Sequence, residues 1–152
     1  MINVIFKPCY SQNNSYLEQI VNALEQNEVC IINKNEEKNI LKKLVVLIRF
    51  IFNPDKRIVH WNWIENITQI PTLKNKIKIK FLLVSVNILH ILGIKVCWTM
   101  HNSVPHNCTD ITFAEHFIKQ WTSKMDMIMV HCKYSMKLLT CKYAYDEKKV
   151  LF

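Results

Sequence analysis

The chain has 152 residues, of which half are hydrophobic and 21% are charged, and its formal net charge is +8 at pH 7. This length fits one domain with a sizeable core, and the composition is too apolar for a disordered segment and too evenly mixed for several membrane spans. With Gly93 as its single glycine, the sequence cannot form the glycine-rich phosphate loops of P-loop or dinucleotide-binding proteins. Asparagine, which occurs in nearly every predicted loop, is expected to fill the turn positions that need a left-handed backbone, while compositional drift from an A/T-rich genome is the favoured explanation of its abundance.

In chain order, the N-terminal half predicts a strand at 2–6, a helix over 15–24, a strand at 29–32, a helix that ends at Phe52 and a strand at 57–61. Asn13, Asn14 or Ser15 caps the first helix. The second helix begins after Asn33 or Asn35. Its last part, 45–52, is nearly all β-branched or aromatic, so a strand there is an open alternative.

The C-terminal half predicts a helix over 81–92 capped by Gly93, a strand at 94–99, a loop over 100–108, a helix over 113–123, a strand at 127–131, a helix over 133–139 and a strand at 148–152. Residues 81–92 fall short of the ~20 residues needed to cross a bilayer and predict a buried or membrane-surface helix. The alternation predicts an α/β fold with a Rossmann-like, mostly parallel sheet of about six strands and helices on both faces, in a single domain over residues 1–152.

The cysteines and the charge bear on location and partners. The six cysteines form no C-x-x-C pair, and we expect mostly buried, reduced thiols in a cytoplasmic protein without a signal peptide. Lysines gather in 34–43 and 74–80, each time beside an apolar stretch. This pattern favours an anionic membrane surface as a partner, with ordinary solvated helix ends as the alternative. Nucleic acid is less expected, because the tryptophans lie mostly in apolar segments.

Histidines follow three of the predicted strands. The polar groups at these strand ends are 60–63, 99–106 and 131–132. Loops that follow parallel strands converge on one edge of a sheet, so we expect the imidazoles of His60, His101 and His131 to face a common cleft. A metal site built from His101, His106 and His131 is not expected, because their spacing matches no zinc pattern.

The run Val96-Cys-Trp-Thr-Met-His-Asn-Ser-Val-Pro-His106, followed by a helix and by Met125-Asp-Met-Ile-Met-Val-His-Cys132, resembles the N-terminal domain of bacterial GT-B glycosyltransferases that build surface polysaccharides. Val59-His-Trp-Asn-Trp63 is similar to the end of that family's third strand, and Asn14-Ser-Tyr-Leu to its first loop. Many relatives have a glycine-rich first loop where this chain has Ser11-Gln12-Asn13-Asn14, which puts contacts at that loop in doubt.

The resemblance implies sugar transfer from a nucleotide-sugar donor, held by a C-terminal domain outside these residues, to a sugar or lipid-linked acceptor held by this half. This half alone is expected to be inactive, to need no other cofactor, and to lie in the cytoplasm, peripheral to the membrane. Whether transfer is inverting or retaining stays open.

His101 would hydrogen-bond the transferred sugar or a phosphate oxygen, with Asp110 or Glu115 as the carboxylate base of an inverting transfer. The expected substrate-binding residues are Asn14, His60, Trp61, Asn102, His106 and His131. Each residue also has a purely structural alternative. The histidines could fix loops by bonding the backbone, the two acids could lie in the first turn of a helix, and the tryptophans, Trp63 included, could belong to the core. The rival hypothesis for the whole chain is a small basic Rossmann-like module that binds nucleic acid or a protein partner.

Overall fold

The computed structural model describes residues 1–7, 14–33 and 40–152, and within them the chain forms one parallel six-stranded sheet with five α-helices. The strands are β1 (Ile2–Lys7), β2 (Val29–Ile31), β3 (Lys56–Asn62), β4 (Lys95–Met100), β5 (Met127–Val130) and β6 (Val150–Leu151). The helices are α1 (Ser15–Gln26), α2 (Ile40–Ile51), α3 (Leu73–Ile91), α4 (Ile111–Thr122) and α5 (Lys133–Lys142), with short 3-10 turns η1 (Ile64–Thr68) and η2 (Glu147–Lys149).

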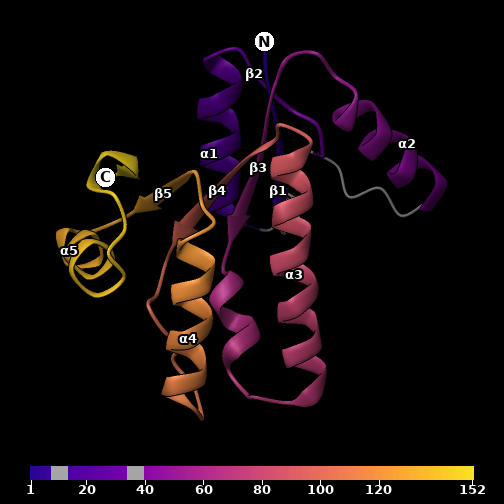
Figure 1. Ribbon diagram of the computed structural model, residues 1–152. Coiled ribbons are helices and arrows are strands. Elements are labelled where there is room, and N and C mark those ends of the chain that lie inside the picture. The colour runs from indigo at the N-terminus through magenta and orange to yellow at the C-terminus, as the bar shows by residue number, and fades with distance from the viewer. Residues whose placement is uncertain (8–13, 34–39) are drawn as a thin grey trace.

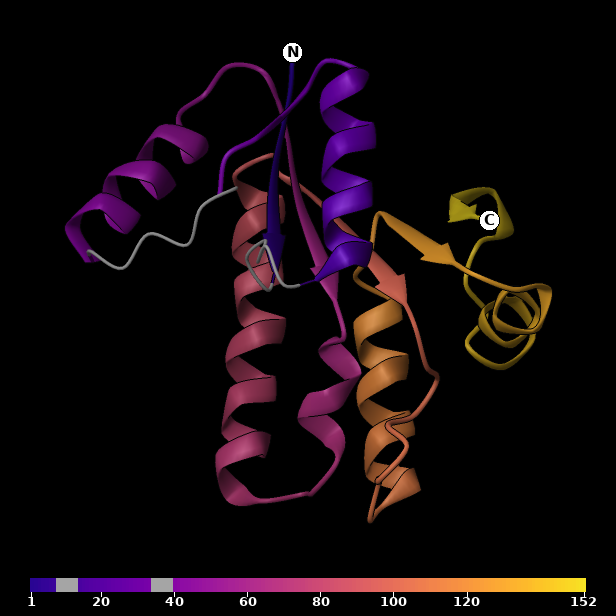
Figure 2. The same ribbon diagram turned by 180° about the vertical axis from the view of Figure 1, so that it is seen from behind.

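The strand order is β2-β1-β3-β4-β5-β6, and every neighbouring pair is parallel. The chain moves outward from β1 to β2 and then returns to the other side of β1, so the direction of winding reverses between β1 and β3. Helix α1 covers one face of the sheet, and α3 and α4 cover the other (Figures 1 and 2). The predicted Rossmann-like α/β fold is confirmed, and ligands of such sheets bind outside the carboxyl ends of the strands at this reversal.

Capping residues set the helix ends. The side chain of Asn14 accepts a hydrogen bond from the backbone N–H of Leu17 and caps α1. Helix α3 begins at Leu73, eight residues before the predicted start. Thr72, which directly follows Pro71, caps the helix by accepting a hydrogen bond from the backbone N–H of Asn75. It ends as predicted at Gly93, whose φ of +70° suits the left-handed residue that follows a helix.

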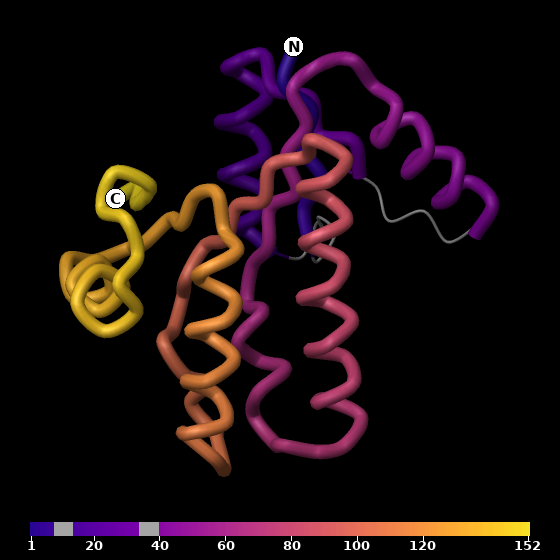
Figure 3. Tube along the Cα trace, in the orientation of Figure 1, coloured from indigo at the N-terminus to yellow at the C-terminus, as the bar shows by residue number. Residues whose placement is uncertain are grey.

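Residues 45–51 belong to helix α2, so the alternative of a strand is wrong. The last turn of helix α2 packs against the body of the domain, and its first turn lies farther out (Figure 3). There Phe50 is buried, and Arg57 donates hydrogen bonds to the carbonyls of Ile51 and Leu92. The predicted start of this helix at Asn35 lies outside the described residues, and Asn33 instead pairs with both backbone groups of Phe6.

Two smaller expectations are wrong. The non-glycine residues with left-handed backbone within the described ranges are Glu28, Trp63 and Ala144, and none of them is asparagine. Of the five described cysteines, all free, only Cys97 is buried. No helix of the described ranges combines the length and apolar character required for a membrane span.

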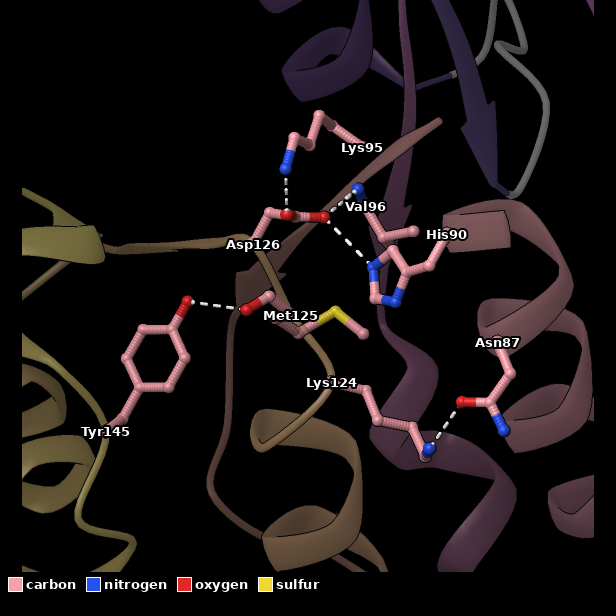
Figure 4. Close-up of polar contacts among 8 residues, drawn as sticks. All are labelled: Asn87, His90, Lys95, Val96, Lys124, Met125, Asp126 and Tyr145. Carbon is pink, nitrogen blue, oxygen red and sulfur yellow. Dashed lines mark hydrogen bonds and ion pairs between the residues drawn. The ribbon is translucent and has the colours of Figure 1, made fainter. Parts of the chain in front are cut away.

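Asp126 ties together three segments at the amino edge of the sheet (Figure 4). One carboxylate oxygen accepts from the backbone N–H of Val96 at 2.8 Å and from Nε2 of His90 at 3.0 Å, and the other accepts from Nζ of Lys95 at 2.8 Å. Burial raises the pKa of Asp126, but the hydrogen bonds from Lys95 and Val96 and the charge of Lys95 outweigh burial and hold this pKa below its ordinary value. The carboxylate therefore joins the end of α3, the start of β4 and the start of β5.

Replacing Asp126 with alanine is expected to lower the free energy of unfolding at pH 7 by about 1–3 kcal/mol, because the N–H of Val96 loses its acceptor. Lys95→Met should cost less than about 1 kcal/mol, because the Lys95 side chain lies on the surface. Urea denaturation of both variants measures the difference, and equal losses would contradict this role of Asp126. Since the pKa of Asp126 is lowered by folding, its contribution is present above an ordinary aspartate pKa of about 3.9 and should disappear in stronger acid.

Candidate functional site

Four aromatic rings meet where the carboxyl ends of the strands adjoin the start of α1. We call Tyr16, Trp63, His101 and His131 the ring cluster. Trp63 stacks on His101 with ring centroids 4.7 Å apart and an interplanar angle of 15°. Tyr16 meets His101 edge-on at 5.1 Å, and His131 lies 5.0 Å from His101. Four separate segments, which are the first turn of α1 and the residues that follow β3, β4 and β5, thus converge as the parallel topology requires.

Polar side chains of β3 and β4 lie next to the ring cluster. Asn62 is paired with Thr99 in the sheet register, so both side chains point to the same face. The hydroxyl of Thr99 lies 2.7 Å from Nε2 of His60, and the Asn62 carbonyl oxygen lies 3.4 Å from Nε2 of His101. The Asn62 side chain is buried, and its amide nitrogen has no hydrogen-bond partner within the described part of the chain. A buried donor without an acceptor next to a ring cluster is a group that a ligand can satisfy.

The imidazoles of His60 and His101 are neutral at physiological pH. Burial lowers the pKa of His60 to about 4, helped by the proximity of His101. Burial likewise lowers the pKa of His101 to about 4, with a smaller contribution from His131. Burial raises the pKa of Tyr16, which a hydrogen bond with Thr99 partly opposes. His60, His101 and Tyr16 therefore present uncharged donors and acceptors at pH 7.

Trp63 has a left-handed backbone, with φ 52° and ψ 29°. This conformation is uncommon for a residue other than glycine, asparagine or aspartate, and it costs a bulky side chain about 1–2 kcal/mol. Such strain is concentrated at functional sites. At Trp63 it turns the chain from β3 into η1 and brings the indole over the imidazole of His101.

Glu65 is a fully buried acid behind the loop that contains His101. Burial raises the pKa of Glu65 to about 7, although its own backbone, the N–H of Asn102 and the indole of Trp98 act in the opposite direction. Neither carboxyl oxygen has a hydrogen bond of ordinary geometry to a described residue. A carboxyl that is half protonated near neutral pH therefore lies beside the backbone of the residue after His101.

The two carboxylates predicted as a catalytic base are engaged elsewhere. Asp110 caps α4 by accepting from the N–H of Phe113 at 2.9 Å. Glu115 forms an ion pair with Lys142 of α5. Both carboxylates therefore have partners outside the ring cluster.

The structure brings together some of the predicted binding residues and not others. His101 and His131 belong to the ring cluster, and His60 is buried beside it, stacked on Phe6 at 4.9 Å. Trp61 points to the opposite face of the sheet and meets Trp121 edge-on at 5.5 Å. The other three candidates have different surroundings: Asn14 is a helix cap, His106 is exposed, and Asn102 approaches Glu65 through its backbone.

Sequence reasoning missed Tyr16 and Glu65, and it gave no role to Asn62 and Thr99 although both lie in the strand-end groups 60–63 and 99–106. Asn62 and Thr99 had a usable signal, because they alternate with Trp61 and Trp98 and so must face away from those rings. The signal for Glu65 was its apolar setting: it lies three residues after the end of β3, between Ile64 and Ile67. Within the described ranges, no three histidine, cysteine, aspartate or glutamate side chains gather as metal ligands would.

The opposite pKa shifts of His60 and Glu65 predict opposite effects on stability. The lowered pKa of His60 means that its contribution is present above about pH 6.5 and is lost as the pH falls toward 4. The raised pKa of Glu65 means that its contribution is present below about pH 4.5 and is lost as the pH rises through 7.

Between pH 4.5 and 7 the free energy of unfolding should therefore rise more steeply with pH in Glu65→Gln than in wild type, and less steeply in His60→Gln. Each difference should reach about 1–3 kcal/mol over the window, since one pKa unit corresponds to about 1.4 kcal/mol. Urea denaturation at four pH values measures the slopes. His116→Gln, at an exposed position of α4, is the matched control and should follow wild type. Parallel curves for all four proteins would rule out both assignments.

Comparison with known proteins does not name a family for this chain. Protein-family models, curated proteins and solved structures give no significant match. The likeness to the N-terminal domain of GT-B glycosyltransferases stays a prediction, and a function has to be inferred from the ring cluster and the sheet edge that carries it.

Proposed function

We propose that this chain is the acceptor-side half of a nucleotide-sugar-dependent glycosyltransferase with a GT-B architecture, and that the ring cluster binds the acceptor sugar. The observation that supports this most is the ring cluster itself, next to the buried, unpaired amide of Asn62 at the reversal point of the sheet. Convergent polar groups on an aromatic wall at this place are typical of a small-molecule site.

The chemistry of the cluster suits a sugar. Pyranose rings present apolar C–H faces and a rim of hydroxyls, and the rings of Trp63 and Tyr16 supply apolar faces with a polar edge. Neutral imidazoles donate through one nitrogen and accept through the other, which matches a hydroxyl group better than an anion. The low pKa values of His60 and His101 favour this neutral state. We therefore assign His101 to hydroxyl recognition in preference to phosphate binding, with the ring of His131 beside it.

The engagement of Asp110 and Glu115 outside the ring cluster fits a half-site. Asp110 and Glu115 are held in a cap and an ion pair, and Glu65 is buried behind the cluster. Acceptor binding is then the contribution of this half. The donor and the groups that complete transfer belong to the C-terminal domain of the proposed enzyme.

Titration with the methyl glycosides of glucose, galactose and N-acetylglucosamine tests the proposal by NMR. At least one sugar should bind with a dissociation constant of about 1 mM and shift the indole resonance of Trp63 together with the imidazole resonances of His101 and His131. His101→Ala should weaken that sugar at least tenfold, because it removes the stacking partner of Trp63 and the contact with Asn62. The control His116→Ala should bind like wild type.

Two results would overturn the proposal. In one, none of the sugars shifts the cluster resonances at concentrations far above the expected dissociation constant. In the other, a short single-stranded oligonucleotide shifts them at micromolar concentration with steep salt dependence, which is the behaviour of the rival nucleic-acid module.

A further inference from the structure

Helix α3 has two apolar faces, of which the sheet covers one. Ile79 and Val86 are buried, and Leu82, Leu83 and Leu89 are partly buried against the core. A second row of apolar side chains follows the opposite side of the helix with spacings of three and four residues. We call it the outer stripe, and it consists of Leu73, Ile77, Phe81, Val84, Ile88 and Ile91.

The outer stripe is open to solvent along the whole helix. Its six side chains are between 46% and 84% exposed. At a rise of 1.5 Å per residue the stripe extends for about 27 Å. Contiguous apolar surfaces of this size are rare on monomeric soluble proteins and mark a surface that binds something.

Lysines border the stripe on both sides. At about 100° per residue, Lys74 and Lys78 project along one edge of the stripe, and Lys76 and Lys80 along the other. All four side chains are exposed, and Lys76 also lies over the ring of Phe113 at 6.0 Å. An apolar stripe with lysines on both edges is typical of a helix that lies in a membrane interface. In such a helix the lysine stems lie along the apolar surface and the ammonium groups reach the lipid phosphates.

An apolar hollow adjoins the stripe between α3 and η1. It has a volume of about 450 Å³ and is lined by Ile67, Lys78, Phe81, Leu82 and Ser85. The apolar lining with a lysine at its border suits an acyl chain whose headgroup is anionic. Helix α2 adds a second exposed apolar face through Ile40, Leu44, Leu47 and Ile48, with Lys43 and Arg49 on other sides of the helix.

Charge decides between the two occupants that an apolar stripe can take. A second copy of the chain, packed stripe to stripe, would bring the lysine borders of both copies together and add to a net charge of +8 on each copy. An anionic bilayer surface instead pairs the same lysines with lipid phosphates, and each lysine then raises the affinity for the membrane by about tenfold or less. The buried face of α3 is held by the sheet, so the helix can only lie along such a surface.

We propose that the outer stripe of α3 docks this domain on the surface of a bilayer that contains anionic phospholipid. The stripe enters the interface, and Lys74, Lys76, Lys78 and Lys80 bind the lipid phosphates. This surface is separate from the ring cluster, so the docking is independent of sugar binding and each can fail without the other.

Co-sedimentation with vesicles of phosphatidylcholine alone, and of phosphatidylcholine with one quarter phosphatidylglycerol, tests the docking. Wild type should partition at least tenfold more strongly to the anionic vesicles, and 0.5 M NaCl should reduce that partition. Replacing Lys74, Lys76, Lys78 and Lys80 with glutamine should lower it at least tenfold. The matched control replaces four other exposed lysines, which are Lys133, Lys137, Lys148 and Lys149, and should keep most of it.

The apolar half of the proposal has its own variant. Phe81→Ser with Ile88→Ser should lower binding to anionic vesicles at least tenfold while circular dichroism and the melting temperature stay close to wild type, because both side chains are exposed. Equal losses in the two lysine variants would show that net charge alone attracts the protein and would overturn docking through α3. So would unchanged binding by Phe81→Ser with Ile88→Ser, absence of anionic binding in wild type, or a dimer in solution that this double variant dissociates.

Discussion

The parallel pairing of β3 with β1 on one side and β4 on the other is the constraint on which the candidate site depends. Its register sets Asn62 beside Thr99 and His60 on the same face of the sheet as Phe6. A shift of one residue would move these polar side chains to the opposite face and replace them with Trp61. Buried apolar side chains on both faces, from Phe6 to Trp98, make that shift costly, so core packing also positions the site.

Most of the fold could be predicted because its signals are local. Apolar runs of strand length alternate with segments whose caps can be read directly, as Asn14 and Gly93 show. Helix α3 was predicted too short, because the alternation of lysine and isoleucine between 74 and 80 hides a helix with apolar residues on two sides. Helix α2 was ambiguous for a related reason. Its β-branched residues favour a strand by composition, but their spacing places most of them along one side of a helix.

The site could be predicted only in part, because it depends on facts that no single segment carries. The meeting of His101 and His131 follows from parallel topology alone, and it was expected. Which residues of 60–63 face that meeting point depends on the side of the sheet that α1 covers, which the sequence does not specify. Trp61 is therefore predicted as a binding residue, although it packs against Trp121. Trp63 reaches the cluster through a left-handed backbone, and no asparagine or glycine at that position indicates such a turn in the sequence.

The uneven burial of α2 has a consequence for how the molecule opens. Because Phe50 and Ile51 carry its core contacts and most side chains of residues 40–48 are exposed, unwinding of its first turns uncovers little of the core of the sheet. Amide protons near Ile40 should then exchange with deuterated solvent through local fraying, whereas those of β3 and β4 exchange only when the whole domain opens.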